Sequence, residues 1–421
     1  MTRKIILLLF LLKGILTTSF AQHQNEAMAD YRLPDVMLAK SGIRISSAAG
    51  WEKMRRPEIL ALFEENVQGK TPAKKIPLRF VTISINYDAL NGIATRKQVR
   101  VYFSKSEKYY MDILMYVPNK RTVPAPLFLG LNFGGNQVVD ADTGILISKG
   151  WVPYAPQPAY INHLGTEASR GIQRNDWPVE KIVAAGYGLA TVYYGDIQPD
   201  SVNSVNAGVA PLFYKDGQTR PAADEWGAIG VWAWGLSRAL DYMETDKDID
   251  AGKVAVVGHS RLGKAALWAG AQDQRFALVI SNNSGEGGAA ITRTKYGETI
   301  ALMNKAFPHW FCDNFKKYND KEDELPIDFH ELVALIAPRP VYIASASQDQ
   351  WADPVGEYLS AWYATPVYGL YGLKGLDTIV PPDVNHPVGE GAIGYHLRKG
   401  EHAMTQYDWD QYIRFANRCL K

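Results

Sequence analysis

One stretch of the chain constrains the fold more than any other, because it joins a buried strand to a helix through a corner that carries a serine. Residues 254–257 are Val-Ala-Val-Val, which predicts a buried strand, and the run from Lys264 to Trp268 predicts a helix. Between them lies Gly-His-Ser260-Arg-Leu-Gly. A serine on such a turn exposes its hydroxyl at a helix N-terminus, where the backbone N–H of Arg261 would face an oxyanion. The stretch therefore predicts that Ser260 is a nucleophile, although Gly263 comes one residue later than in the G-x-S-x-G pattern.

Two cations accompany this corner. Arg261 and Lys264 both fall in the first turn of the predicted helix, where positive charge opposes the helix dipole by roughly 0.3–1 kcal/mol each. One interpretation is that both side chains simply point into water. We favour a functional interpretation, in which they stabilise negative charge on a substrate or intermediate, because they flank the candidate nucleophile.

The composition is that of a globular protein, with 47% hydrophobic residues, 21% charged residues and a formal net charge of +1. This balance gives no support for nucleic-acid binding. The chain has no C-x-x-C pair and no H-E-x-x-H pattern, so we expect no metal site. Its two cysteines, Cys312 and Cys419, could pair after export, but the sequence does not show whether they meet, and it is silent on oligomeric state.

The N-terminus has the pattern of a secretory signal. A basic start at Arg3 and Lys4 precedes an apolar run that ends at Ser-Phe-Ala21, and a small-x-small triplet is what signal peptidase requires. We expect residues 1–21 to be removed and the mature chain to be exported, to the periplasm or beyond, with no membrane association afterwards. An uncleaved membrane anchor is the alternative.

The rest of the chain alternates strand and helix patterns, which favours an α/β fold with a mostly parallel central sheet and helices on both faces. We expect residues 22–421 to form one domain, with an N-terminal extension and cleft-lining insertions, one of them at 136–180. The predicted strands are 98–103, 110–117, 126–133, 188–194, 254–257, 276–280, 339–344 and 393–397, and the predicted helices are 51–65, 179–185, 224–243, 328–336, 357–363 and 407–420, besides the helix after Ser260.

A serine nucleophile needs a general base, and where this corner is used the base follows the serine and the acid along the chain. His402 lies in a loop between the last predicted strand and the last predicted helix, which is where such a base is expected. His386 is the second choice. The patterns around His330 and His396 place them inside regular elements, which favours a packing role.

The acid has several candidates. Asp349 follows the predicted strand 339–344, at the edge where the sites of α/β sheets assemble, and we choose it. Asp353 precedes a proline and is typical of a cap, Asn283 cannot ionise, and Glu286 stays open as an alternative in a glycine-rich turn. A second oxyanion donor is expected in the loop at Gly134-Gly135, after strand 126–133.

Several motifs together resemble one enzyme family. They are Gly258-His-Ser-Arg-Leu-Gly-Lys264, Asn283-Ser-Gly-Glu-Gly-Gly288, His309-Trp-Phe-Cys-Asp-Asn-Phe315, Ser347-Gln-Asp-Gln-Trp-Ala-Asp-Pro354 and Gly394-Tyr-His-Leu-Arg398 followed by Gly-Glu-His402. This combination is similar to that of the bacterial glucuronoyl esterases of carbohydrate esterase family 15, from about residue 95 onward. The fungal members carry Cys where this chain has His259.

The resemblance implies an α/β-hydrolase that cleaves esters between 4-O-methyl-glucuronic acid on xylan and lignin alcohols, without a cofactor. It implies that Ser260 is the nucleophile, His402 the base and Arg261 an oxyanion stabiliser. Lys264, Glu298 and Trp351 match positions that contact the sugar. The fungal acid would fall at Asn283, whereas similar bacterial members place it after the next strand, which matches Asp349.

Two other functions share parts of this pattern. A different carbohydrate serine esterase, such as an acetylxylan esterase, would use the same triad, although two cations beside the serine argue against a purely apolar acyl pocket. A non-catalytic carbohydrate-binding protein on the same scaffold would not need Ser260, Asp349 and His402 together.

Overall fold

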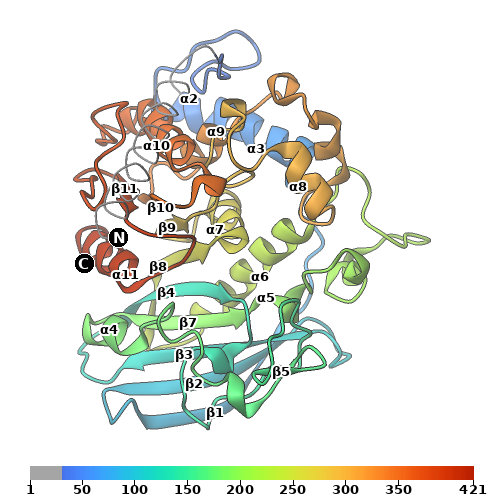
Figure 1. The fold of residues 1–421 in the computed structure, drawn as a ribbon, viewed down its shortest axis with the longest axis vertical. Helices are drawn as coiled ribbons and strands as arrows, with labels where there is room; N and C mark the ends of the chain where they lie inside the picture. Colours follow the sequence, from blue (N-terminus) through green and yellow to red (C-terminus); the bar gives the residue numbers. More distant parts are fainter. Residues whose placement is uncertain (1–30) are drawn as a thin grey trace, which may run out of the picture.

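A nine-stranded mixed sheet runs through the computed structural model, which describes residues 31–421 (Figure 1). Its strand order is β1-β2-β3-β7-β4-β8-β9-β10-β11. The strands are β1 Arg79–Ala89, β2 Ala94–Tyr102, β3 Tyr110–Pro118, β4 Ala125–Asn132, β7 Gly188–Tyr193, β8 Ile249–His259, β9 Leu278–Asn282, β10 Val341–Ala346 and β11 Ile393–Arg398. The predicted signal peptide, residues 1–21, lies outside the described residues.

The sheet divides into an antiparallel edge and a parallel remainder. β1, β2, β3 and β7 pair antiparallel in that order, whereas every pairing from β7 through β4, β8, β9 and β10 to β11 is parallel. Residues 254–257 of β8 are fully buried although their side chains alternate between the two faces. Both faces of the parallel part are therefore covered, which agrees with the predicted α/β-hydrolase fold.

Most of the predicted helices are present, with boundaries shifted by a few residues. Longer helices cover the sheet, and α7 packs on β8 and β9. The helices are α2 Ala48–Gly50, a π-helical turn Trp51–Arg55, α3 Arg56–Asn66, α4 Val179–Ala184, α5 Tyr194–Ile197, α6 Ala228–Met243, α7 Arg261–Gln272, α8 Ile300–Ala306, α9 Phe329–Ala334, α10 Pro354–Gly369 and α11 Gln406–Cys419.

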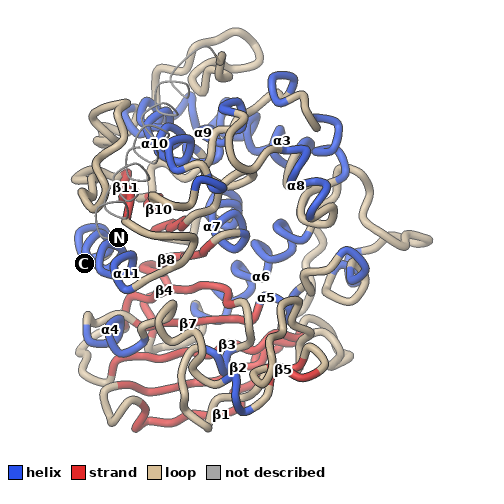
Figure 2. The backbone as a smooth tube through the Cα atoms, in the orientation of Figure 1, coloured by secondary structure: helices blue, strands red, loops and turns tan. Residues whose placement is uncertain are grey.

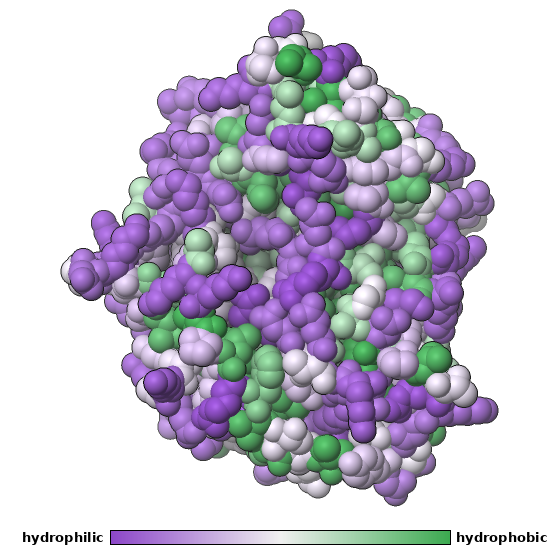
Figure 3. Space-filling view, turned by 180° about the vertical axis from the view of Figure 1, so that it is seen from behind, coloured by the Kyte–Doolittle hydropathy of each residue, from purple (hydrophilic) through white to green (hydrophobic). Residues whose placement is uncertain are grey.

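Figure 2 shows α3, α8, α9 and α10 gathered at one end of the molecule, with α10 packed beside β10 and β11, while β1 to β3 lie at the opposite end. No helix within residues 31–421 is long and apolar enough to cross a membrane. Seen from behind, the surface is mostly hydrophilic, with separate apolar patches (Figure 3).

Three features differ from the sequence prediction or extend it. β1 was not predicted, and it forms an edge strand whose Ile83, Ile85 and Tyr87 are exposed. The 136–180 insertion contains a short hairpin of β5 (Tyr160–Ile161) and β6 (Leu164–Gly165). Cys312 and Cys419 are both free thiols in the structure.

Candidate active site

The corner after β8 forces Ser260 into a strained backbone conformation. Its φ is 57° and its ψ is −132°, a combination that a residue with a side chain rarely adopts. The neighbouring glycines make the turn possible, because a Cβ on Gly258 would lie 2.0 Å from the carbonyl oxygen of Leu262. A Cβ on Gly263 would lie 3.1 Å from the side chain of Ser284, which is a tight contact, so the glycine lets α7 begin close to the loop after β9. This corner places Ser260 at the N-terminus of α7, as predicted.

The structure brings His402 and Asp349 together. Nδ1 of His402 lies 2.6 Å from Oδ2 of Asp349, and because a carboxylate only accepts, this nitrogen carries the proton and Nε2 is free to take one. The His402 ring also lies 4.5 Å from the ring of His259, the residue before Ser260. The Asp349 side chain is buried whereas 41% of the His402 side chain is exposed. The base is thus open to solvent and its carboxylate is not.

Asn283, which cannot itself ionise, also contacts this carboxylate. Its Nδ2 donates to Oδ2 of Asp349 at 2.7 Å, so one oxygen accepts from both His402 and Asn283. Burial raises the pKa of Asp349, but these hydrogen bonds, and the positive charge of His402 when it is protonated, outweigh that effect and leave the pKa below its usual value. The carboxylate therefore stays ionised near neutral pH.

Glu286, the alternative acid, is not the partner of His402. Its side chain is buried, and burial raises its pKa well above the usual range. Its backbone carbonyl accepts from Nζ of Lys264 at 2.5 Å. The loop after β9 thus contributes Asn283 as a partner of the acid, while the loop after β10 supplies the carboxylate.

Arg261 lies between two aromatic rings and faces a buried carboxylate. Its guanidinium carbon is 5.3 Å from the ring centre of Phe133 and 5.0 Å from that of Trp310. Its Nε lies 3.4 Å from Oδ2 of Asp200, which also accepts from His309 and Trp310 through Oδ1. These contacts fix the direction of the guanidinium.

Lys264 is more deeply enclosed than the sequence indicated. Its ammonium donates to the carbonyl oxygens of Ser284 at 2.6 Å and Glu286 at 2.5 Å, and to Oε2 of Glu298 at 2.9 Å. An ammonium has three N–H groups, so each already faces a protein oxygen. A sugar hydroxyl that binds Lys264 would have to replace one of these contacts, and Glu298 is the side chain among them that can move.

Glu298 and Trp351, both predicted to contact the sugar, are neighbours in the structure. The backbone N–H of Glu298 donates to the carbonyl oxygen of Trp351 at 2.9 Å. Trp351 follows Asp349 in the short 3-10 turn Gln350–Ala352, and half of its surface (51%) is exposed. An exposed indole beside the acid can stack on a sugar ring.

The predicted second oxyanion donor needs a correction at Gly135. Its φ is 97°, which suits glycine, but its N–H donates to Oδ1 of Asn132 at 2.9 Å. That N–H is therefore not available to an oxyanion. The side chain that this loop brings to the site is Phe133, which packs on Arg261.

The other histidines have structural partners. His396 is fully buried in β11 with Nε2 2.8 Å from Asp408, and His330 is buried with Nε2 donating to the carbonyl oxygen of Pro34. Both agree with the predicted packing role. His386, the second choice for the base, contacts the carbonyl oxygen of Val384 two residues away. Asp353 caps α10, as expected.

Asp200 belongs to the site, although the sequence did not indicate it. It follows α5 in a proline-containing loop beyond the end of β7, and that position was its only signal. A cavity of about 520 Å³ opens here, lined by Arg261, Asp200, His309, Tyr154 and Phe307 among others. The space beside the guanidinium is large enough to admit part of a substrate.

A serine on a strained corner between β8 and α7, with an imidazole held by a buried carboxylate from the ends of later strands, places this protein among the α/β-hydrolases. Comparisons of the sequence and fold with known proteins identify the family within this class. A family profile described as "Glucuronyl esterase, fungi" matches residues 185–372. The chain is 49% identical over 388 residues to the carbohydrate esterase MZ0003 of an unknown prokaryotic organism, covering 92% of this chain and 89% of that protein.

Two further relatives carry more specific names. The chain is 34% identical over 351 residues to 4-O-methyl-glucuronoyl methylesterase 1 of Wolfiporia cocos, covering 81% of this chain and 72% of that one. The solved glucuronoyl esterase from Solibacter usitatus matches with a TM-score of 0.88 at 49% identity, over 93% of this chain and 99% of that one. The chain belongs to the glucuronoyl esterases, carbohydrate esterase family 15.

Proposed function

We propose that this protein is a serine esterase that hydrolyses 4-O-methyl-glucuronoyl esters, and that its natural substrates are the esters that join glucuronic acid on xylan to lignin alcohols. In this proposal Ser260 is the nucleophile, His402 the general base and Asp349 the acid. The observation that carries it is the 2.6 Å hydrogen bond from His402 to Asp349 beside the Ser260 corner. Family membership supplies the substrate class.

The acylation step follows from the protonation states. Nε2 of His402 removes the proton of the Ser260 hydroxyl while Oγ attacks the ester carbonyl carbon. The oxyanion that forms lies at the N-terminus of α7, where the N–H of Arg261 points. The guanidinium of Arg261 adds positive charge that favours the intermediate over the neutral ester. Collapse expels the alcohol, which takes the proton from His402 and leaves a glucuronoyl ester on Ser260.

Deacylation repeats the sequence with water. His402 removes a proton from a water molecule that attacks the glucuronoyl carbonyl, and then returns the proton to Oγ of Ser260. The charge of Asp349 stabilises the imidazolium in both steps. The product is a uronate anion, so the cations that favour the oxyanion also face the charge that the reaction creates. The sugar would lie against Trp351, with its hydroxyls on Glu298 and Lys264.

The substrate assignment is tested by comparing benzyl glucuronate with p-nitrophenyl acetate. A glucuronoyl esterase prefers the uronate ester, whereas an acetylxylan esterase or general carboxylesterase prefers the acetate. Ser260→Ala should remove hydrolysis of both esters, because without the serine hydroxyl no acyl-enzyme can form. A folded Ser260→Ala protein that still hydrolyses the glucuronate ester at the wild-type rate would refute the assigned nucleophile, and a strong preference for acetate would refute the substrate class.

We further propose that the protein is exported. The support is the basic, apolar and small-x-small pattern of residues 1–21. Expression of the full chain in a bacterium and sequencing of the N-terminus tests this, with Gln22 expected as the first residue and the intact Met1 form as the contrary result.

A further inference from the structure

A fully buried carboxylate, that of Asp408 in the first turn of α11, receives hydrogen bonds from two directions. Oδ1 accepts from Nδ2 of Asn282 at 3.1 Å and faces Nε2 of His396 at 2.8 Å. Oδ2 accepts from Nε of Arg398 at 3.0 Å, and from the N–H and hydroxyl of Thr405 at 2.6 and 2.7 Å. Every one of these partners lies on a segment next to the active site, and no step of the hydrolysis uses Asp408.

Arg398 connects this carboxylate to the loop that carries the base. Its Nη2 donates to the carbonyl oxygen of Glu401 at 2.7 Å and to that of Ala403 at 2.6 Å. These are the residues on either side of His402. One buried guanidinium thus holds the backbone immediately before and after the imidazole, while its Nε binds Asp408.

Asn282 connects the same carboxylate to the nucleophile. Its Nδ2 donates to Asp408 and to the hydroxyl of Tyr412 at 2.7 Å, which leaves Oδ1 facing Nδ1 of His259 at 2.6 Å. An amide oxygen only accepts, so Nδ1 of His259 carries the proton. Burial lowers the pKa of His259 to about 3, so its ring is neutral. His259 precedes Ser260, and its ring contacts that of His402.

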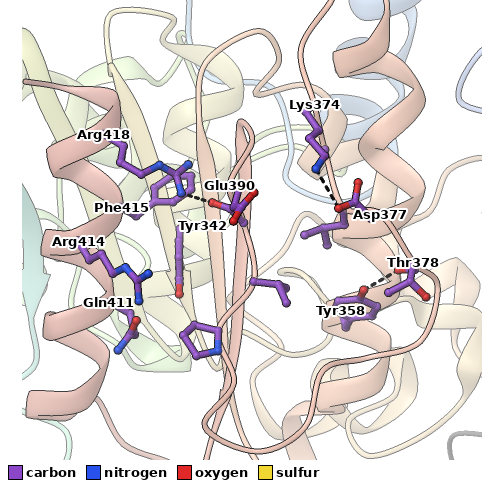
Figure 4. Close-up of a pocket in the computed structure, with 15 residues that line it drawn as sticks. Tyr342, Tyr358, Lys374, Asp377, Thr378, Glu390, Gln411, Arg414, Phe415 and Arg418 are labelled. Atoms are coloured by element: carbon purple, nitrogen blue, oxygen red, sulfur yellow. Dashed lines mark hydrogen bonds and ion pairs between the residues drawn. The ribbon is translucent and has the colours of Figure 1, made fainter.

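The charge of Asp408 is balanced by Arg398. His396 also faces the carboxylate, but burial lowers its pKa and its Nδ1 lies 3.0 Å from the hydroxyl of Tyr342. Tyr342 lines a cavity of about 420 Å³ between α10 and α11 (Figure 4). His396 is therefore neutral and lies between this cavity and Asp408. The positive charge that a buried carboxylate requires comes from the guanidinium of Arg398.

We propose that Arg398 and Asp408 form a positioning pair that sets the separation between His402 and Ser260. Arg398 fixes the two peptide units around the base, and Asp408 ties that loop, through Asn282 and His259, to the strand end that carries the nucleophile. Neither side chain contacts the reacting atoms. The inference rests on the proposed function, in which His402 is the base for Ser260.

Arg293 offers a matched control for Arg398. It is also buried, pairs with the buried carboxylate of Asp328 at 3.0 Å, and donates to the carbonyl oxygens of Ile327 and Leu325. The loop that it holds carries none of the residues assigned to the reaction. Arg293→Met therefore removes the same chemistry from the same kind of site without affecting the base.

The experiment compares kcat, KM and urea unfolding for Arg398→Met, Arg398→Lys and Arg293→Met on benzyl glucuronate. A displacement of the base of about 1 Å lowers the rate about 100-fold, so we expect that loss in kcat for Arg398→Met with KM changed less than about threefold. Arg398→Lys keeps the charge but cannot hold both carbonyls, and should lose about tenfold. Arg293→Met should lose stability but keep kcat within about threefold.

Equal losses of kcat in Arg398→Met and Arg293→Met would overturn the proposal. If Arg398→Met does not fold, Arg398→Lys decides, and a wild-type kcat in that variant rejects the positioning pair. Ser260→Ala separates failure of the positioning pair from failure of the proposed function. An inactive Ser260→Ala with a fully active Arg398→Lys rejects only the positioning pair, whereas an active Ser260→Ala rejects the proposed function itself.

Discussion

Replacing Asp349 by asparagine tests how the base is held, and the structure predicts an unusual result. His402 and Asn283 both direct N–H groups at the same oxygen, Oδ2 of Asp349, at 2.6 and 2.7 Å. In Asp349→Asn the amide keeps both contacts only if its oxygen occupies that position. The flipped amide would set its NH₂ group against two donors and lose two hydrogen bonds, each worth about 1 kcal/mol. Asn283 therefore keeps the correct tautomer of His402 in the variant.

The magnitude follows from what is lost. Asp349→Asn keeps the orientation but removes the charge that stabilises the imidazolium, so we expect to lose most of a charged hydrogen bond, about 1.5–3 kcal/mol. This corresponds to a fall in kcat/KM of roughly 10- to 200-fold. When the wrong tautomer is also adopted, as in a serine protease with the same substitution, the fall reaches about 10⁴-fold. The double variant with Asn283→Ala, in which the amide can flip, should approach that larger loss.

The assay is kcat/KM for benzyl glucuronate across pH for both single variants and the double variant. Asn283→Ala alone should lose only a fewfold, because Asp349 keeps its charge and its bond to His402. The double variant should lose more than the product of the single losses. If Asp349→Asn alone already loses about 10⁴-fold and Asn283→Ala adds nothing to it, the reasoning about the shared oxygen is wrong.

Two further predictions concern stability. Burial lowers the pKa of His330 to about 3, below its value of about 6.5 in the unfolded chain. The neutral, buried imidazole therefore contributes fully to stability above about pH 6.5, and that contribution falls as the pH drops further. When the pH is lowered from about 7.5 to about 5.5, the free energy of unfolding of His330→Gln should fall about 1.4 kcal/mol less than that of the wild type. Urea unfolding at both pH values measures this, and an equal fall in the two proteins would contradict the prediction. Gly258→Ala should destabilise by about 3 kcal/mol or more, because its Cβ would lie 2.0 Å from Leu262. Gly369→Ala is the control, since nothing lies within 4 Å of its Cβ, and thermal unfolding of both variants checks the contrast.

Local patterns in the sequence were enough to predict the parallel part of the sheet. The strand and helix around Ser260 differ in hydrophobic period and are separated by glycines, and β8 and α7 follow that pattern. β1 was missed because it is an edge strand with exposed apolar residues. Its apolar and polar residues therefore do not alternate between a buried face and a solvent-exposed face. The resemblance of several motifs to one family supplied the function class, which the comparisons support.

The contacts among the site residues are set by the tertiary structure. Chain order and the position after β10 favoured Asp349, but its hydrogen bond to His402, its shared oxygen with Asn283 and the burial of Glu286 depend on how three strand ends meet. The partners of Lys264, and the use of the Gly135 N–H by Asn132, are equally invisible in the sequence. Hydrophobic period is a property of neighbouring residues, whereas a hydrogen bond between residues far apart in the chain exists only once the packed sheet has fixed the direction of both side chains.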